Sequence, residues 1–305
     1  MIYTVTLNPA IDYVMQLGDT LQPGAVNRAG HTAYQFGGKG INVSTVLARL
    51  GVPSVALGFA AGATGEWLAQ GLAQQGLNAD LIRLPEGMTR INVKLRAGPQ
   101  GEETELNAMG PLISADAFAR LQAKLEALQP QDILVLSGSI PMGVPRDIYL
   151  RLAQPLATRG VRVVVDTAGS ALWQTLPCKP YLVKPNHHEL GELFGRDLRT
   201  EAEIVERAGI LQRQGARNVL VSMAGNGALL LDETGAVHRV GAPKGTVINS
   251  VGAGDSMVAG FLAGIACGKD YADALRLGIA CGSATAFSLG LAEAQQIEQI
   301  LTTDF

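Results

Sequence analysis

The 305-residue sequence predicts an α/β fold in three layers, with a mostly parallel sheet between two layers of helices and a small β-sheet lid. Short β-branched runs at residues 132–137, 162–166, 181–184 and 218–223 alternate with helix-like segments such as 146–159 and 201–214. This alternation is typical of parallel strands joined by crossover helices. In contrast, residues 14–30 and 90–106 are polar, strand-like and interrupted by Gly and Pro, which predicts a separate antiparallel lid.

The remaining elements complete the same architecture. Strand-like residues 2–7 and 54–59 are expected to join the main sheet, and the last third predicts helices at 254–266, 271–288 and 293–301. The chain shows neither an internal repeat nor a linker-like segment. We therefore expect one domain over residues 1–305, with lid strands at about 13–34 and 89–107.

Composition narrows the classes of partner. The 47% of hydrophobic residues is ample for a core, and 37 glycines in 305 residues, about 12%, exceed the usual value of about 7%. These glycines form short clusters, which suit loops that approach phosphates closely. The net charge of −3 provides no general attraction to nucleic acid or acidic membranes, so neither is expected as a partner.

Cysteine usage and the N-terminal segment predict a cytoplasmic location. The three cysteines have no C-x-x-C spacing and suggest neither a disulfide framework nor a zinc site. Residues 2–7 are strand-like rather than part of a signal sequence, and the chain lacks a stretch of 18 apolar residues. We expect a soluble cytoplasmic protein.

The most informative motif is SVGAGDS at residues 250–256. Its small residues allow backbone N–H groups to surround an anion, and a helix expected from about Gly254 adds the positive end of its dipole. Asp255 would lie beside a transferring phosphate, where it can accept the proton of an attacking hydroxyl. An aspartate that only caps the helix explains the segment equally well.

A second glycine cluster, FGGKGINV at residues 36–43, leads into an apolar helical pattern. Lys39 adds positive charge at that helix start, and Asn42 can both donate and accept hydrogen bonds. Together they suit a hydroxylated or phosphorylated ligand. The alternative is a tight glycine turn with a solvated lysine.

Two further segments suggest sugar-phosphate binding. Asp12 follows the first strand at the edge where open α/β sheets bind ligands, although it could also stabilise a turn. Arg90, Asn92 and Lys94 share one face of a strand and could bind a phosphate, with Arg90 as the fork-shaped donor. Charges that protect an exposed edge strand explain the same pattern.

Polar residues also end two of the later strands. Ser137 and Ser139 follow one of them, and Lys184 ends another, with Asn186 and Glu189 just beyond it. Glu189 could hold the water shell of Mg²⁺ on a nucleotide, whereas a capping box explains the Asn-x-x-Glu spacing without a metal. The dinucleotide fingerprint G-x-G-x-x-G and the phosphate loop G-x-x-x-x-G-K-[ST] are both absent from the sequence, which disfavours dehydrogenases and P-loop ATPases.

In this order, the motifs resemble the ribokinase-like sugar kinase family over essentially the whole chain. The matching segments are LNP at 7–9 with Asp12, residues 37–43, Val221-Ser222 with Gly225 and Gly227, and residues 251–256. Residues 1–9, 38–43 and 89–95 are most similar to the bacterial kinases of fructose 1-phosphate, with tagatose 6-phosphate kinases second. The resemblance implies a ribokinase-like core, a lid that forms a homodimer interface, and phosphorylation of fructose 1-phosphate to fructose 1,6-bisphosphate with ATP and Mg²⁺.

The resemblance also assigns roles to individual residues. Asp255 would be the base, and Gly252, Ala253 and Gly254 would complete the anion hole. The ketose phosphate would contact Asp12, Gly37, Gly38, Lys39, Asn42, Arg90, Ser137 and Ser139. The nucleotide would contact Lys184, Asn186, Glu189, Ser222, Gly225, Gly227, Asn249 and Gly254, with Glu189 reaching Mg²⁺ through water.

One departure concerns the nucleotide loop, where Ala224 stands at a position that is usually glycine in the family. Its methyl group could crowd the nucleotide or require a backbone shift. Alternatives to fructose 1-phosphate are tagatose 6-phosphate and fructose 6-phosphate. A non-catalytic sugar-phosphate sensor is a further alternative, although binding alone has no use for Asp255 as a base.

Overall fold

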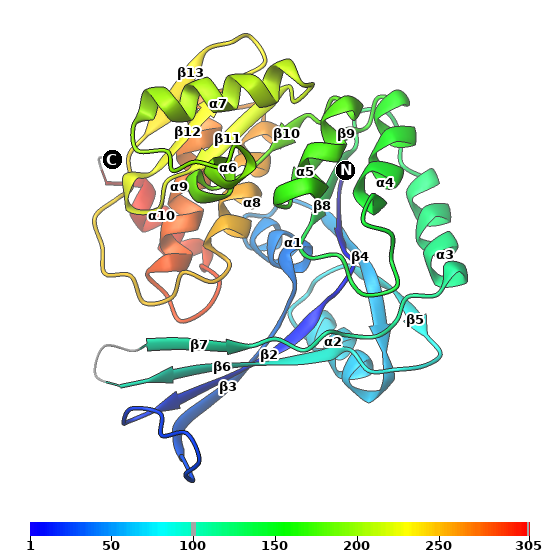
Figure 1. Cartoon of the computed structure of the whole chain (residues 1–305), viewed down its shortest axis with the longest axis vertical. Coiled ribbons are helices and arrows are strands. Elements are labelled where there is room, and N and C mark those ends of the chain that lie inside the picture. Colours follow the sequence, from blue (N-terminus) through cyan, green and yellow to red (C-terminus); the bar gives the residue numbers. More distant parts are fainter. Residues whose placement is uncertain (99–101, 304) are drawn as a thin grey trace.

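A nine-stranded sheet forms the centre of the computed structural model, which describes residues 1–98, 102–303 and 305 (Figure 1). Its strand order is β13-β12-β11-β10-β9-β8-β1-β4-β5, parallel from β11 to β5, with β12 and β13 antiparallel. The strands are β1 (Ile2–Thr6), β4 (Ser54–Ala61), β5 (Ala79–Leu84), β8 (Ile133–Ser137), β9 (Arg162–Asp166), β10 (Leu182–Val183), β11 (Asn218–Ser222), β12 (Ala228–Leu231) and β13 (Val237–Val240).

Helices cover both faces of this sheet because its strands are apolar on both sides. In β9, for example, Val163 and Val165 belong to one core cluster and Val164 to the other. One face carries α3 (Ala115–Glu126), α4 (Ile148–Thr158), α5 (Gly169–Thr175), α6 (His187–Leu193) and α7 (Glu201–Arg213). The other carries α1 (Lys39–Arg49), α2 (Gly62–Gln74), α8 (Ala253–Ala266), α9 (Tyr271–Ala286) and α10 (Ala294–Leu301). The α/β class and the three layers are confirmed.

The lid is a separate four-stranded sheet, seen below the core in Figure 1. Its order is β3-β2-β6-β7, built from β2 (Ala10–Leu17), β3 (Ala29–Gly37), β6 (Arg90–Ala97) and β7 (Glu102–Leu106). The two outer pairs are antiparallel, but β2 and β6 are parallel, so the prediction of an antiparallel lid is wrong for the central pair. Both strands follow carboxyl ends of parallel core strands, β1 and β5, and therefore run in the same direction.

The lid adjoins the carboxyl edge of the core sheet. The chain passes from β1 into β2 there, and it returns from β3 into α1. Polar residues end the neighbouring core strands, with Thr6 on β1, Ser137 on β8, Asp166 on β9 and Ser222 on β11. Polar strand ends therefore face the lid, which is the usual location of ligand sites in open α/β sheets. Within the described ranges, every helix is too short or too polar to cross a bilayer.

Candidate active site

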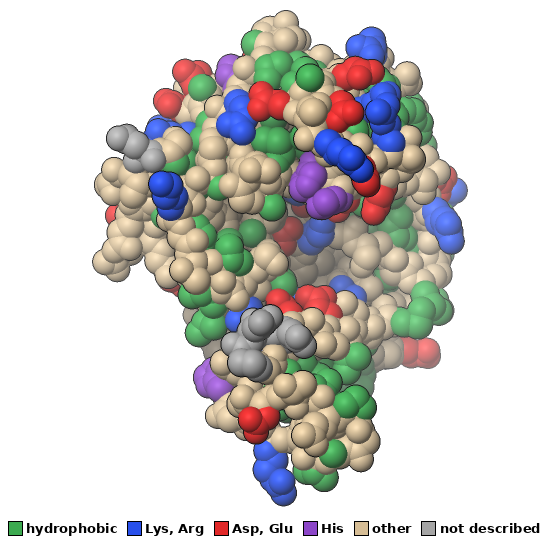
Figure 2. All heavy atoms as spheres, turned by 60° about the vertical axis from the view of Figure 1, so that its left-hand side comes forward, with side chains coloured by type: hydrophobic (Ala, Val, Ile, Leu, Met, Phe, Trp, Pro, Cys, Tyr) green, Lys and Arg blue, Asp and Glu red, His purple; other side chains and the backbone are tan. Residues whose placement is uncertain are grey.

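A cavity of about 650 Å³ separates the lid from the carboxyl edge of the core. Figure 2 shows this hollow between the lid and the body of the protein, with acidic and basic side chains on its walls. A second cavity of about 650 Å³ lies beside it and is more apolar. Asn186, Ser222 and Gly254 line both, so the two cavities meet at the start of α8.

The turn that begins α8 requires glycine. Gly252 has φ +80°, and a Cβ there would lie 2.6 Å from Cδ2 of Leu291. It is also the N-cap residue, so α8 starts at Ala253 and Asp255 lies in its first turn. The alternative that Asp255 only caps the helix is therefore wrong. Free N–H groups and the positive end of the dipole are presented where the cavities meet.

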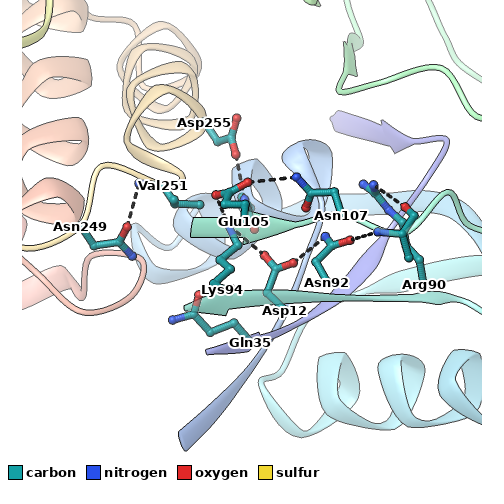
Figure 3. A network of polar contacts seen from close by, with 12 residues as sticks. Asp12, Gln35, Arg90, Asn92, Lys94, Glu105, Asn107, Asn249, Val251 and Asp255 are labelled. Atoms are coloured by element: carbon teal, nitrogen blue, oxygen red, sulfur yellow. Dashed lines mark hydrogen bonds and ion pairs between the residues drawn. The ribbon is translucent and has the colours of Figure 1, made fainter. Parts of the chain in front are cut away.

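Asp255 is held in place by the second glycine segment. Its side chain is buried, and its Oδ2 accepts a hydrogen bond of 2.8 Å from Nδ2 of Asn42 (Figure 3). Burial raises its pKa from 3.8 to about 6, and the charge of Asp166 acts in the same direction. The charge of Lys39 and the Asn42 hydrogen bond oppose this rise. Asp255 is thus a better proton acceptor than an ordinary aspartate and is still ionised at neutral pH.

Asp166 connects the two lysines of the site, and the sequence analysis missed it. Its Oδ1 lies 3.1 Å from Nζ of Lys184 and 3.8 Å from Nζ of Lys39. The Asp166 charge is the main cause that raises the pKa of Lys39. Removing either partner of the buried pair Asp166–Lys184 would lower the stability of the protein by about 3–5 kcal/mol. The sequence did contain a signal for Asp166, because a carboxylate follows three consecutive valines at the end of an expected parallel strand.

A row of polar side chains crosses the inner face of the lid. Asp12 Oδ1 accepts a hydrogen bond of 2.8 Å from Asn92, and its Oδ2 lies 3.5 Å from Nζ of Lys94. Lys94 also contacts Glu105 Oε1 at 3.0 Å (Figure 3). Asp12 lies within β2 and β6 is an interior strand, so the turn and edge-strand alternatives are both wrong. The sequence analysis missed Glu105 and its neighbour Asn107, because pairing between strands brings them to the cavity.

Arg90 ties the base of the lid together. Its Nε and one terminal nitrogen donate to the carbonyl of Asn8 at 3.2 and 2.9 Å, and the other terminal nitrogen donates to the carbonyl of Ala108 at 3.3 Å. Two of its five N–H groups are left for a ligand. The three lysines that line the cavity are within 4 Å of carboxylates, but Arg90 has no such partner in the described part of the chain.

The glycines of the second cluster allow close packing. A Cβ at Gly38, which has φ +129°, would lie 2.5 Å from Cγ2 of Thr6, and one at Gly40 would lie 2.7 Å from Oγ1 of the same residue. These glycines therefore close tightly on Thr6, but Gly38 also lines the cavity under the lid, so the tight turn does not exclude a ligand; Lys39 is paired with Asp166 rather than only solvated. Gly37 lines a smaller neighbouring cavity of about 350 Å³, not the main one.

The other predicted residues divide between the two cavities. Ser137, Ser139, Lys184 and Glu189 line the cavity under the lid, and Gly225, Gly227 and Ala253 line the second one. Lys184 and Glu189 thus line the cavity under the lid, although we predicted nucleotide contacts for them. Nζ of Lys184 nevertheless lies close to Gly254, where the two cavities meet. The sequence analysis did not single out His187, Lys244, Met257 and Phe287 of the second cavity.

Three predicted nucleotide ligands make hydrogen bonds within the protein. Asn186 and Glu189 form a capping box at the start of α6, with Glu189 Oε2 accepting from the Asn186 backbone N–H at 2.8 Å. Asn249 is absent from the described lining of both cavities. Its side chain accepts the N–H of Val251 at 2.9 Å and donates to the carbonyl of Leu289 at 3.2 Å, which shapes the chain before α8.

Comparisons with known proteins agree with this geometry. The model of the pfkB family carbohydrate kinases matches residues 5–298. The chain belongs to this family. It is 47% identical over 301 residues to a 1-phosphofructokinase of Bacillus subtilis, covering 99% of this chain and 97% of the relative. It is also 38% identical over 300 residues to a D-tagatose-1-phosphate kinase of Bacillus licheniformis, covering 98% and 97%.

A solved structure supports the same assignment. Phosphofructokinase-2 from Escherichia coli, in complex with substrates and products, superposes with a TM-score of 0.93 at 31% identity. The match covers 98% of this chain and 97% of the other. The family resemblance of the motifs is therefore confirmed, and the chain is a carbohydrate kinase that transfers a phosphoryl group to a hydroxyl.

Proposed function

We propose that this kinase transfers the γ-phosphoryl group of ATP to fructose 1-phosphate and forms fructose 1,6-bisphosphate. The observation that carries the proposal is the position of Asp255, a buried carboxylate with a raised pKa at the junction of the two cavities. The polar cavity under the lid suits a sugar phosphate, and the more apolar one suits a nucleotide base. The name of the Bacillus subtilis relative supports the choice of substrate.

The reaction needs one proton acceptor and one anion site. A sugar hydroxyl beside Asp255 gives its proton to the carboxylate, its oxygen bonds to the γ-phosphorus, and the bond to the leaving ADP oxygen breaks. N–H groups of residues 252–255 stabilise the charge that develops on the transferring group. Asp255 later releases its proton to solvent. Positioning and electrostatics supply most of the rate, so no covalent intermediate on the enzyme is required.

The lid cavity offers ligands for both ends of the sugar phosphate. Arg90 retains two N–H donors and has no carboxylate partner among the described residues, which favours it as the anchor of the substrate phosphate, together with Lys39. Asp12 and Asn42 suit the sugar hydroxyls. We assign the remaining contacts to Gly38, Ser137 and Ser139, which line this cavity, whereas Gly37 lines the smaller neighbouring one.

The second cavity would hold ATP. Met257, Ile279 and Phe287 provide apolar surface for the base, and Ser222, Gly225 and Gly227 line the same cavity. Lys184, Asn186 and Gly254 would contact the phosphates where the cavities meet. We assign Asn249 an indirect role, because it binds the Val251 N–H rather than lining the cavity.

The acidic residues fit a magnesium ion that arrives with the nucleotide. A group of three His, Cys, Asp or Glu able to hold a metal directly is missing from the described residues. Glu189 uses Oε2 in its capping box, and Oδ2 of Asp166 is buried without a partner among the described residues. The charges of both carboxylates raise the pKa of Lys39, so both lie near it. We propose that Glu189 holds the ion through water; the ion would neutralise phosphate charge.

We also propose a cytoplasmic homodimer formed through the lid. The outer face of the lid exposes Tyr34, Ile91 and Leu106, and Tyr34 stacks on Tyr13 with ring centroids 4.6 Å apart. An apolar sheet face of this kind suits contact with a second copy of the chain. The cytoplasm is where ATP and sugar phosphates are available together.

A coupled assay of ADP release tests the proposed reaction. The purified protein is supplied with MgATP and, in turn, fructose 1-phosphate, tagatose 1-phosphate, tagatose 6-phosphate, fructose 6-phosphate, fructose or no sugar. We expect the highest kcat/KM with fructose 1-phosphate. A higher value with another ketose phosphate would reassign the substrate, and binding without turnover would identify a sensor.

A further inference from the structure

Gln35 lies on the inner face of the lid but binds the core. In the strand register it stands directly opposite Asp12, on the side away from Asn92. Its Nε2 donates a hydrogen bond of 3.2 Å to the carbonyl of Leu289, in the segment between α9 and α10 (Figure 3 labels Gln35, Asp12 and Asn92). The residue opposite the proposed sugar ligand therefore holds a core segment far away in the sequence.

The same carbonyl leads to the anion hole. Leu289 O also accepts the side-chain amide of Asn249 at 3.2 Å, and Oδ1 of Asn249 accepts the backbone N–H of Val251 at 2.9 Å. Val251 immediately precedes Gly252, the N-cap of α8. Leu291, two residues after Leu289, packs so closely on Gly252 that a Cβ would not fit. Lid and anion hole thus share one short segment.

We propose that Gln35 is a positioning residue that couples occupation of the sugar cavity to the geometry of the anion hole. This inference rests on the proposed function, in which Asp12 binds the sugar and residues 252–255 bind the transferring phosphate. Gln35 lines the smaller cavity of about 350 Å³ and is absent from the described lining of both main cavities, so it acts through Leu289 and Asn249.

The shared segment has other anchors besides Gln35. Arg49 donates to the carbonyls of Leu291 and Ala292 at 2.5 and 3.0 Å, and it pairs with Glu293 at 2.9 Å. Loss of the Gln35 amide therefore frees the lid from the segment and leaves the segment anchored to α1. The expected effect is a loss of coupling between the two substrates, not unfolding.

The test compares Gln35→Glu and Gln35→Leu with Gln75→Leu as a matched control. Glutamate keeps the size of Gln35 but, when ionised, cannot donate to a carbonyl. Gln75 lines the same small cavity, and no side-chain hydrogen bond of it is found within the described ranges. Titration calorimetry measures the affinity for a non-hydrolysable ATP analogue with Mg²⁺, with and without saturating fructose 1-phosphate.

We expect the sugar phosphate to tighten nucleotide binding in the wild type and in Gln75→Leu. In both Gln35 variants this ratio should fall by about 2- to 10-fold, the range for one hydrogen bond, and linkage requires the same factor in sugar affinity. The kcat should fall by a similar factor, and the KM for fructose 1-phosphate at saturating MgATP should rise by the factor that is lost from the coupling. Melting temperatures identify any variant that fails to fold.

Three results would overturn the proposed coupling. The nucleotide affinity of the wild type could be the same with and without the sugar phosphate, the Gln35 variants could keep the wild-type affinity ratio and kcat, or Gln75→Leu could lose as much of the affinity ratio as the Gln35 variants. Failure of the proposed function looks different. In that case the wild type phosphorylates no sugar phosphate of the panel, whatever residue occupies position 35.

Discussion

Replacing Asp255 by asparagine should stabilise the protein while nearly abolishing turnover. Folding transfers this carboxylate from water, where its pKa is 3.8, to a buried site where its pKa is about 6. The folded state therefore holds the proton more tightly than the unfolded state. Stability is highest while Asp255 is protonated, decreases as the pH rises above 3.8, and levels off above about 6.

The size of the effect follows from these two pKa values. They differ by about 2.2 pH units, so ionised Asp255 costs about 3 kcal/mol of stability once the pH is well above 6. At pH 5 the same relation gives roughly half of that cost. Asparagine has a similar shape, keeps an oxygen for the Asn42 amide, and carries no charge. The stability advantage of Asp255→Asn should thus grow by about 1–2 kcal/mol from pH 5.0 to 7.5.

Urea unfolding of both proteins at several pH values measures this advantage. Titrating groups far from Asp255 contribute equally to both proteins and cancel in the difference. The Asp255 charge does raise the pKa of Lys39, but that lysine titrates well above this pH range. The kcat at pH 7.5 should fall by about 10²–10⁴, the usual value of a positioned base. An advantage that does not vary with pH would refute the raised pKa, and near-normal turnover of a folded variant would remove Asp255 from the mechanism.

Three further substitutions test other parts of the site. Arg90→Ala should cost about 1.5–3 kcal/mol of transition-state stabilisation, measured from kcat/KM, with fructose 1-phosphate and much less with fructose. An equal loss with both sugars, measured together with stability in urea, would mean that Arg90 only connects the carbonyls of Asn8 and Ala108. Glu189→Gln keeps a capping-box residue without the charge, so the Mg²⁺ concentration for half-maximal rate should rise at constant melting temperature; a change in melting temperature alone would favour the capping role. Ala224→Gly should stabilise the protein by about 1 kcal/mol, since Ala224 has φ +49°, and should lower the KM for ATP; a destabilised variant contradicts this.

Local patterns were sufficient to predict the core of the fold. Runs such as Ile133–Ser137 and Arg162–Asp166 are apolar on both faces, and only a strand covered by helices on both sides buries such a run. The glycine turn around residue 252 was also predictable from the sequence. Gly252 has φ +80° and packs on Leu291, so the position excludes other side chains and glycine marks it. These features depend on residues close together in the sequence.

The missed features depend on contacts between distant segments. The parallel pairing of β2 with β6 joins residues about 80 positions apart, and nothing in either strand alone specifies its partner or direction. Glu105 reaches the cavity only because β7 pairs with β6 and places it opposite Lys94. Likewise, the local sequence does not distinguish Asp166 from other residues at strand ends. Its role follows from the fold, which brings Lys39 and Lys184 to its carboxylate.

The pairing of charges supports the proposed selectivity of the site for a phosphorylated sugar. Lys39 and Lys184 are matched by Asp166, and Lys94 by Asp12 and Glu105, so most of the positive charge in the lid cavity is already neutralised. Arg90 alone among the described cations of this cavity lacks a carboxylate within 4 Å. A general excess of positive charge would bind any anion, including a second nucleotide. A single guanidinium without a carboxylate within 4 Å, held by two backbone carbonyls, would instead favour one phosphate at one position. Under the proposed function, the reacting hydroxyl would then be directed towards Asp255.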